Sequence, residues 1–203
     1  MMTDPYNEIC KLDPNKPVFL AEWGVGEFPP GDKAGFIEGV KCLLNRELIQ
    51  KSVARGLAEI ANDQPVSPMS PYYNAELKPR AYDPEKAKSL FEKAGLLGQS
   101  IPVVASEAAT SSVEMATLLQ QSGAEIGMKF DIQRVPSDGY WSNYWLVAPI
   151  HFGNINPRPT PDILFSLLYA SEAPWNESQY KSAKFDSMLI EARGSLDQAK
   201  RKE

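Results

Sequence analysis

The sequence predicts an α/β protein, a three-layer-like lobe with βαβ units and a mixed sheet. Residues 101–105 are an apolar run, residues 111–126 follow a helical period, and Phe130 and Ile132 alternate with polar residues. Strand, helix and strand in so short a stretch make a βαβ unit, whose strands lie parallel. A second apolar run, residues 146–152, predicts another buried strand of the same sheet.

Composition limits the function classes. The chain has 203 residues with 43% hydrophobic and 23% charged residues, which is typical of a globular protein with one sizeable core or two small ones. A net charge of −5 argues against nucleic acid or an anionic membrane surface as a partner. No apolar run approaches about 18 residues, so we expect no membrane insertion.

Histidine and cysteine are scarce. His151 is the only histidine, which excludes a histidine-rich metal site and a catalytic triad that needs more than this residue. We therefore expect no metal and no cofactor. Cys10 and Cys42 stand at unrelated spacing, and we expect no structural disulfide between them. Acidic residues near the N-terminus predict that this chain carries no export signal.

The first helices have clear start signals. A helix over residues 33–44 has an apolar stripe, and Asn45 caps a second helix. Residues 63–82 hold four prolines and predict an extended segment. The stripe residues that we expect to be buried in the first helix are Phe36, Ile37, Val40, Leu43 and Leu44.

Three later helices also have start signals or stripes. Asp83 before a proline starts a helix with Ala87, Leu90, Phe91 and Ala94 inward. Ser111 and Glu114 form a capping box for the 111–126 helix. A helix over residues 182–193 should turn Phe185, Leu189 and Ile190 inward.

One candidate site lies between residues 138 and 162. Four rings gather at helical spacing, and a proline-rich loop with Arg158 follows the apolar run. A stiff loop that leaves a buried strand is a plausible place for a ligand in an α/β sheet. The alternative is that the rings are core and the arginine is solvated. The four rings belong to Tyr140, Trp141, Tyr144 and Trp145.

Residues 16–37, KPVFLAEWGVGEFPPGDKAGFI, resemble the seventh strand, loop and helix of a (β/α)8-barrel glycoside hydrolase. In those enzymes the glutamate at this strand end, here Glu22, is the nucleophile. A barrel needs about 250 residues, and the six strands that should precede this one have no room in the 15 residues before it. A retaining glycosidase also needs a second carboxylate about 5 Å from the first, and no predicted strand supplies it. A glycoside hydrolase fragment with Glu22 as former nucleophile is thus the alternative function, and we expect no hydrolase activity.

Residues 38–203 resemble the large extracytoplasmic solute-binding proteins of ABC transporters, the peptide, nickel and oligosaccharide group. The matching motifs, in order, are NRELI at 45–49, RG at 55–56, SPMSPYY at 67–73, AYDPEKAKSLFEKAGL at 81–96, DGYWSNYW at 138–145, RPTPD at 158–162 and KFDSMLIEAR at 184–193. The resemblance implies a two-lobed type II periplasmic-binding-protein fold, located in the periplasm or outside the cell and associated with the membrane.

The same resemblance implies a binding protein without catalytic residues. Its partners would be a small-molecule solute (a sugar, a peptide or an anionic compound) and an ABC permease. Residues 41–203 would form a partial second lobe and residues 1–40 a segment of uncertain origin. We expect a truncated chain without a complete ligand cleft; a chimeric chain with no activity of its own is a third hypothesis.

The resemblance also bears on the solute. In peptide-binding members an aspartate for the ligand amino group falls at about Pro157, and Arg158 stands beside that position. A cation there favours anionic or hydroxyl-rich solutes over peptide N-termini. We expect Tyr140 and Trp141 on the exposed wall, and Trp145 and Phe152 buried. The expected ligand-binding residues are Arg158, Trp141, Tyr140, Asn156, Thr160 and Ser106.

Overall fold

The computed structural model describes residues 23–24, 33–66, 68–156, 158–179, 181–197 and 200. Glu22, Cys10, Pro157 and most of the 1–40 segment, on which several sequence predictions rest, lie outside these residues. Buried apolar side chains form two clusters. The larger one surrounds a small parallel sheet, and the smaller one lies between the last two described helices.

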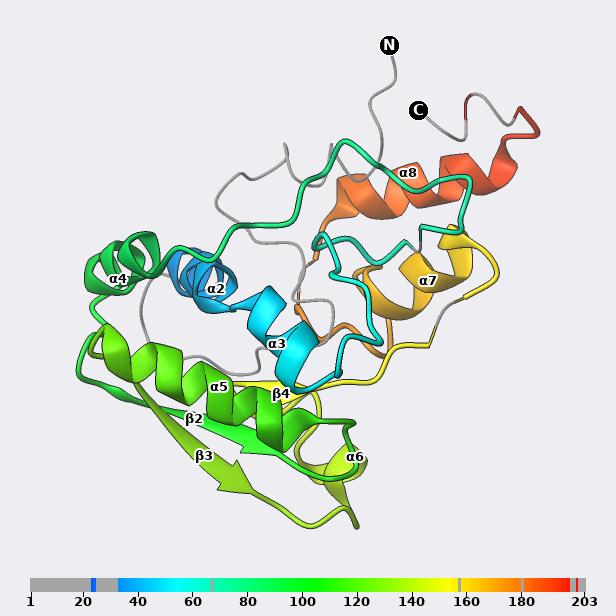
Figure 1. The fold of residues 1–203 in the computed structure, drawn as a ribbon. Helices are drawn as coiled ribbons and strands as arrows, with labels where there is room; N and C mark the ends of the chain where they lie inside the picture. The colour runs from blue at the N-terminus through cyan, green and yellow to red at the C-terminus, as the bar shows by residue number, and fades with distance from the viewer. Residues whose placement is uncertain are drawn as a thin grey trace.

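The predicted βαβ unit is present. Strands β2 (Ser100–Ala105) and β3 (Lys129–Arg134) pair in parallel, as predicted, with Ile101 opposite Phe130. Helix α5 (Ser112–Glu125) lies across this pair (Figure 1). The close approach depends on Gly123, where a Cβ atom would lie 2.5 Å from the Phe130 ring.

The capping box predicted for α5 is wrong. Ser111 has a left-handed backbone with φ 57° and makes no side-chain capping bond. Ser112 takes the structural role instead: its hydroxyl donates to the Ser106 carbonyl oxygen at 2.6 Å and accepts from the Ser106 N–H at 3.0 Å. This pair of bonds closes the turn between β2 and α5, and Ser106 is buried by it.

Helices α2 (Lys33–Leu43) and α4 (Pro84–Lys93) pack against each other, and α2 also contacts α5. All five stripe residues expected in the first helix are buried, and in the second Leu90 alone is only partly buried. Asn45 caps α3 (Arg46–Ser52) and Asp83 caps α4, each through its side-chain oxygen. Both caps were predicted.

The strand predicted over residues 146–152 is mostly wrong. Only β4 (His151–Phe152) is a strand, and it pairs antiparallel with β1 (Trp23–Gly24). Leu146 has φ 65°, which bends the chain out of an extended path, and its N–H donates to the ring of His151. The Val104 N–H still donates to the Ile150 carbonyl at 2.9 Å, so this segment stays attached to β2.

Helices α7 (Pro161–Leu168) and α8 (Ala183–Gly194) hold the smaller cluster, on the opposite side of the molecule from β3 (Figure 1). Phe185 and Leu189 are buried, as predicted, but Ile190 is 66% exposed, so the predicted stripe is too wide. The short helix α6 (Tyr140–Asn143) follows β3. None of the described helices is long and apolar enough to cross a bilayer.

Candidate functional site

The carboxyl end of β2 and the segment after β4 meet at one edge of the structure. The Thr110 N–H donates to the Asn154 side-chain oxygen at 3.2 Å, and the Asn154 amide donates to the Ala108 carbonyl at 3.4 Å. Ligands of open α/β sheets bind outside the carboxyl ends of the strands. The structure therefore places the residues after β2 and β4 where such a ligand would lie.

A cavity of about 390 Å³ opens between α3, the start of α5 and Asn154. This volume is within the range of small-molecule pockets. Its polar residues are largely paired within the protein: Arg46 with Asp63 at 2.6 Å, and Gln50 with the Ala58 carbonyl at 2.7 Å. The apolar part of its lining includes Leu44, Ile49, Val53, Ile60 and Met115.

A smaller hollow of about 110 Å³ lies at the segment that leads to α7. Asn156, Arg158 and Thr160, three of the predicted ligand residues, all line it. The Thr160 hydroxyl also caps α7 by accepting from the Ile163 N–H at 3.4 Å. Asn154 thus lines the larger cavity, and Ile155, Asn156, Arg158 and Thr160 line the smaller hollow.

Three tryptophans form a continuous series of rings, here called the tryptophan series: Trp141, Trp145 and Trp175. The Trp141 and Trp145 centroids are 5.7 Å apart, and the Trp145 and Trp175 centroids are 6.0 Å apart, both edge to face. Trp141 and Trp175 are exposed at 42% and 36%, whereas Trp145 is partly buried against the larger cluster. Such a series offers flat apolar faces to a ligand.

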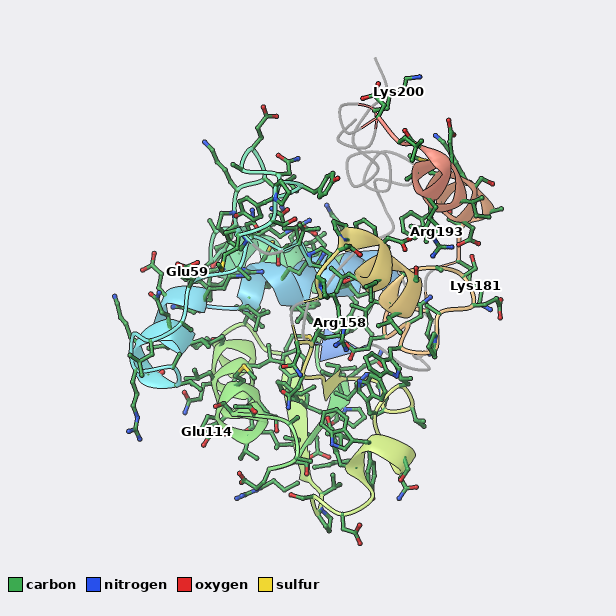
Figure 2. The ribbon with its side chains drawn as sticks, turned by 90° about the vertical axis from the view of Figure 1, so that its right-hand side faces the viewer. Glu59, Glu114, Arg158, Lys181, Arg193 and Lys200 are labelled. Atoms are coloured by element: carbon green, nitrogen blue, oxygen red, sulfur yellow. The ribbon has the colours of Figure 1, made fainter. Side chains whose placement is uncertain are left out.

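Arg158 continues this series. Its guanidinium carbon lies 5.4 Å from the centroid of the Trp175 ring, within the range of a cation–π contact. Among the described residues, no carboxylate lies within ion-pair distance of Arg158, whereas Arg46, Arg80, Arg134 and Arg193 each have such a partner. Figure 2 shows Arg158 at the segment that leads into α7. Its charge is available to a ligand.

Two of the predicted ligand-binding residues are buried. Tyr140 is fully buried rather than exposed, because its hydroxyl bonds to the backbone of Phe152. Burial raises the pKa of this hydroxyl, and its hydrogen bond to the Phe152 backbone opposes the rise. Ser106 is also buried, at the turn into α5. The expectation that Phe152 is buried is confirmed, and Trp145 is buried only in part.

The structure brings in residues that sequence reasoning missed. Trp175 and Glu177 lie in the run SEAPWNESQY, Thr110 follows β2 and Asn154 follows β4, and none of the four is among the predicted ligand-binding residues. A tryptophan within the polar run SEAPWNESQY was the one signal that could have marked the loop. Asn154 gave no such signal, because nothing local to it differs from an ordinary loop.

His151 lies behind the site and is fully buried. Its Nε2 accepts from the Leu146 N–H at 3.2 Å, so Nδ1 carries the proton and donates to the Ala148 carbonyl at 3.0 Å. Burial lowers the pKa of His151 to about 4. The ring is a neutral structural bridge at ordinary pH. In the described part of the chain, no three His, Cys, Asp or Glu residues gather as metal ligands.

Comparison with known proteins identifies relatives. The family described as "Bacterial extracellular solute-binding proteins, family 5 Middle" matches residues 26–177. The "Dipeptide-binding protein" of Escherichia coli is 28% identical over 188 residues, which cover 86% of this chain and 34% of that protein. "Heme-binding protein A" of Haemophilus influenzae is 28% identical over 189 residues, with the same coverage of 86% and 34%. The chain thus spans about a third of the length of these relatives.

Solved structures agree on the fold. DppA from Helicobacter pylori, in complex with peptide STSA, has a TM-score of 0.74 and 24% identity, covering 97% of this chain and 41% of that one. NikZ from Campylobacter jejuni, in complex with Ni(L-His), has a TM-score of 0.73 and 20% identity, covering 99% and 45%. The comparisons give no support to the glycoside-hydrolase resemblance of residues 16–37, and the family match includes residues 26–37 of that segment. The chain belongs to family 5 of the bacterial extracellular solute-binding proteins.

Proposed function

We propose that this chain is part of the solute-binding component of an ABC transporter, which acts outside the cytoplasm and delivers its solute to a permease. Family membership supports this role, because the relatives named above are binding proteins rather than enzymes. Residues 41–203 then supply a partial second lobe, and the solute lies against the edge that carries Asn154, Arg158 and the tryptophan series.

The observation that carries the proposal is the state of Arg158. Its guanidinium lies over the Trp175 ring at cation–π distance, is half-buried, and has no carboxylate partner among the described residues. A planar guanidinium binds a carboxylate or phosphate through two parallel hydrogen bonds. The cation–π contact restrains the guanidinium before the solute arrives, which reduces the ordering cost of binding. Arg158 is therefore the proposed anion contact of the site.

The surroundings of Arg158 favour a solute with a flat or apolar body. Trp141 and Trp175 present exposed faces, and Asn156 and Thr160 add polar groups beside the guanidinium. We infer that the solute is a small carboxylated compound, for which a short peptide held by its C-terminal carboxylate is the simplest representative. A hydroxyl-rich sugar would use the indole faces but not the charge of Arg158.

The test uses nuclear magnetic resonance of the 203-residue protein. This method detects weak binding, which we expect because a partial second lobe encloses only part of the ligand surface. The chain has four tryptophans, so its indole N–H signals are few and report directly on the series. Three probes are titrated: the dipeptide alanyl-phenylalanine, its C-terminal amide, and maltotriose. We expect the free carboxylate to shift the Trp141 and Trp175 signals at lower concentration than the amide does.

Variants assign the preference to one residue. Arg158→Ala should abolish the difference between the dipeptide and its amide, and Arg158→Lys should restore it in part. Arg134→Ala is the matched control, because Arg134 pairs with the exposed Glu107 and lies outside both hollows. An Arg158→Ala protein that still prefers the carboxylate would overturn the anion assignment, and a wild-type protein that prefers maltotriose would overturn the solute class.

A further inference from the structure

A buried carboxylate lies beneath the tryptophan series. Glu177 is 8% exposed, and its Oε1 accepts a hydrogen bond from the Trp145 indole N–H at 2.5 Å. The two residues are 32 positions apart, so the bond joins the loop before α8 to the segment after α6.

Gly153 makes room for this carboxylate. A Cβ atom at position 153 would collide with Glu177 Oε1, and it would lie 3.1 Å from Cδ and 3.3 Å from Oε2. Gly153 has no positive φ, so space rather than backbone conformation requires glycine there. The carboxyl group therefore lies against the backbone at Gly153 with Oε1 nearest, where a side chain at position 153 would displace it.

The backbone of Glu177 is held as well. Its N–H donates to the Trp175 carbonyl oxygen at 2.9 Å, and the Trp175 N–H donates to the Leu167 carbonyl oxygen in α7 at 3.0 Å. The loop that carries Trp175 and Glu177 is thus attached to α7 through one residue and to the tryptophan series through the other. Trp145 packs against the larger hydrophobic cluster and Leu167 against the smaller one, so this loop connects the two.

We propose that Glu177 is a positioning residue of the solute site: its buried carboxylate, which lies against Gly153, fixes the Trp145 indole, and Trp145 in turn orients Trp141 and Trp175. Glu177 does not itself touch the solute. The proposal rests on the proposed function, since it concerns the same site, and it adds a residue on which solute affinity depends indirectly.

The hydrogen bond between Trp145 and Glu177 can position all three rings because of where Trp145 lies. Trp145 is the middle ring, and its edge contacts reach Trp141 at 80° and Trp175 at 67° between ring planes. An indole that rotates away from Glu177 loses both contacts together. The tryptophan series would then have to become ordered when the solute binds. The entropy cost of ordering one large side chain weakens binding by about two- to tenfold.

The first arm of the test needs no solute. Indole N–H signals and their exchange with deuterium are recorded for the wild type, Glu177→Gln, Glu177→Ala and Gly153→Ala. We expect the Trp145 signal to move and to lose its protection in Glu177→Ala and Gly153→Ala, whereas Glu177→Gln keeps an acceptor and much of the protection. The control is Glu172→Ala, which removes a carboxylate of the same loop that pairs with Lys181 at the surface.

The second arm measures affinity for alanyl-phenylalanine in a double-mutant cycle. Glu177→Ala should weaken binding by about two- to tenfold in the wild-type background and have no further effect in a Trp145→Phe background. Glu177→Gln should bind nearly as the wild type does. Melting temperatures recorded in parallel separate this effect from a general loss of structure. A merely structural role would lower the melting temperature in both backgrounds, and the effects of the two substitutions on dipeptide affinity would then be additive.

The outcomes are separable. An unchanged Trp145 signal in Glu177→Ala, or additive effects in the cycle, would overturn the positioning role even if the dipeptide binds. Should the wild type bind no dipeptide, the proposed solute class fails. The exchange arm then still decides whether Glu177 fixes Trp145, through the contrast between Glu177→Ala and Glu177→Gln.

Discussion

The hydroxyl of Tyr140 joins both backbone polar groups of Phe152, donating to the carbonyl oxygen at 2.7 Å and accepting from the N–H at 3.0 Å. Both residues are buried. The hydroxyl therefore takes the place of a neighbouring strand for one residue of β4. This contact ties the start of the aromatic segment to the strand from which the site loop departs.

Removing that hydroxyl should be costly. Tyr140→Phe removes one hydrogen bond from a buried N–H and one from a buried carbonyl, and we expect the free energy of unfolding to fall by about 1–3 kcal/mol. Urea unfolding followed by tryptophan fluorescence measures the change. The matched control is Tyr144→Phe, since the half-buried Tyr144 has no hydroxyl partner among the described residues and should change stability by less than about 0.5 kcal/mol. Equal losses in the two variants would contradict this reading.

Stability should fall on acidification because of His151. Its pKa is lowered to about 4 in the folded protein, while an unfolded chain titrates near about 6.5. Between these values the unfolded state binds more protons, so stability is fully present above about pH 6.5 and is lost as pH falls toward 4. The loss from this group is about 3 kcal/mol over that range.

The measurement is the unfolding free energy of the wild type and His151→Gln at several pH values. Carboxylates also titrate at the acid end, so the informative quantity is the difference between the two proteins. That difference should shrink as pH falls from about 6.5 to about 4, because the glutamine variant has no imidazole to protonate. A difference that stays constant would show that His151 does not govern this pH range.

A buried ion pair should be sensitive to loss of one charge. The Asp63 carboxylate lies 2.6 Å from the Arg46 guanidinium, with the two side chains 8% and 15% exposed, and it also pairs with Arg80 at 3.1 Å. Asp63→Asn keeps the shape and tolerates the φ of 60° at this position, but it leaves Arg46 uncompensated. We expect a loss of about 3 kcal/mol.

The surface pair of Arg134 and Glu107 provides the contrast. Both side chains are well exposed, at 66% and 72%, so Glu107→Gln should cost less than about 0.5 kcal/mol. Thermal unfolding of the two variants under one set of conditions gives the comparison. A loss for Asp63→Asn no larger than that for Glu107→Gln would contradict the prediction that the buried pair is sensitive to loss of one charge.

Gly123 should not accept a side chain. A Cβ atom there would lie 2.5 Å from the Phe130 ring, so Gly123→Ala has to push α5 away from β3. We expect a loss of about 1–3 kcal/mol, although alanine is the better helix former. Gly194→Ala is the control, because a Cβ atom at position 194 would meet no other atom within 4 Å, and alanine there should be neutral or stabilising by up to about 1 kcal/mol. Calorimetry shows whether each variant is less stable or more stable than the wild type.

Much of the architecture could be predicted from local pattern. The caps at Asn45 and Asp83 form as expected, since each depends on a side chain and a backbone N–H three residues later. The parallel pairing of β2 with β3 also follows from spacing, because a helix between two nearby strands allows few other arrangements. Where the backbone has a left-handed residue, as at Ser111 and Leu146, the same reasoning failed.

The candidate site could also be predicted only in part from the sequence. Residue types and a stiff proline loop sufficed to nominate Arg158 and Trp141, because a cation and an exposed ring beside a strand end are local features. Only the tertiary structure decided that Tyr140 is buried, that Trp175 lies beneath Arg158, and that Glu177 reaches Trp145. These relationships join segments that are distant in the chain. Their geometry depends on how residues packed on one hydrophobic cluster contact residues packed on the other, and the periodicity of a single segment does not encode such contacts.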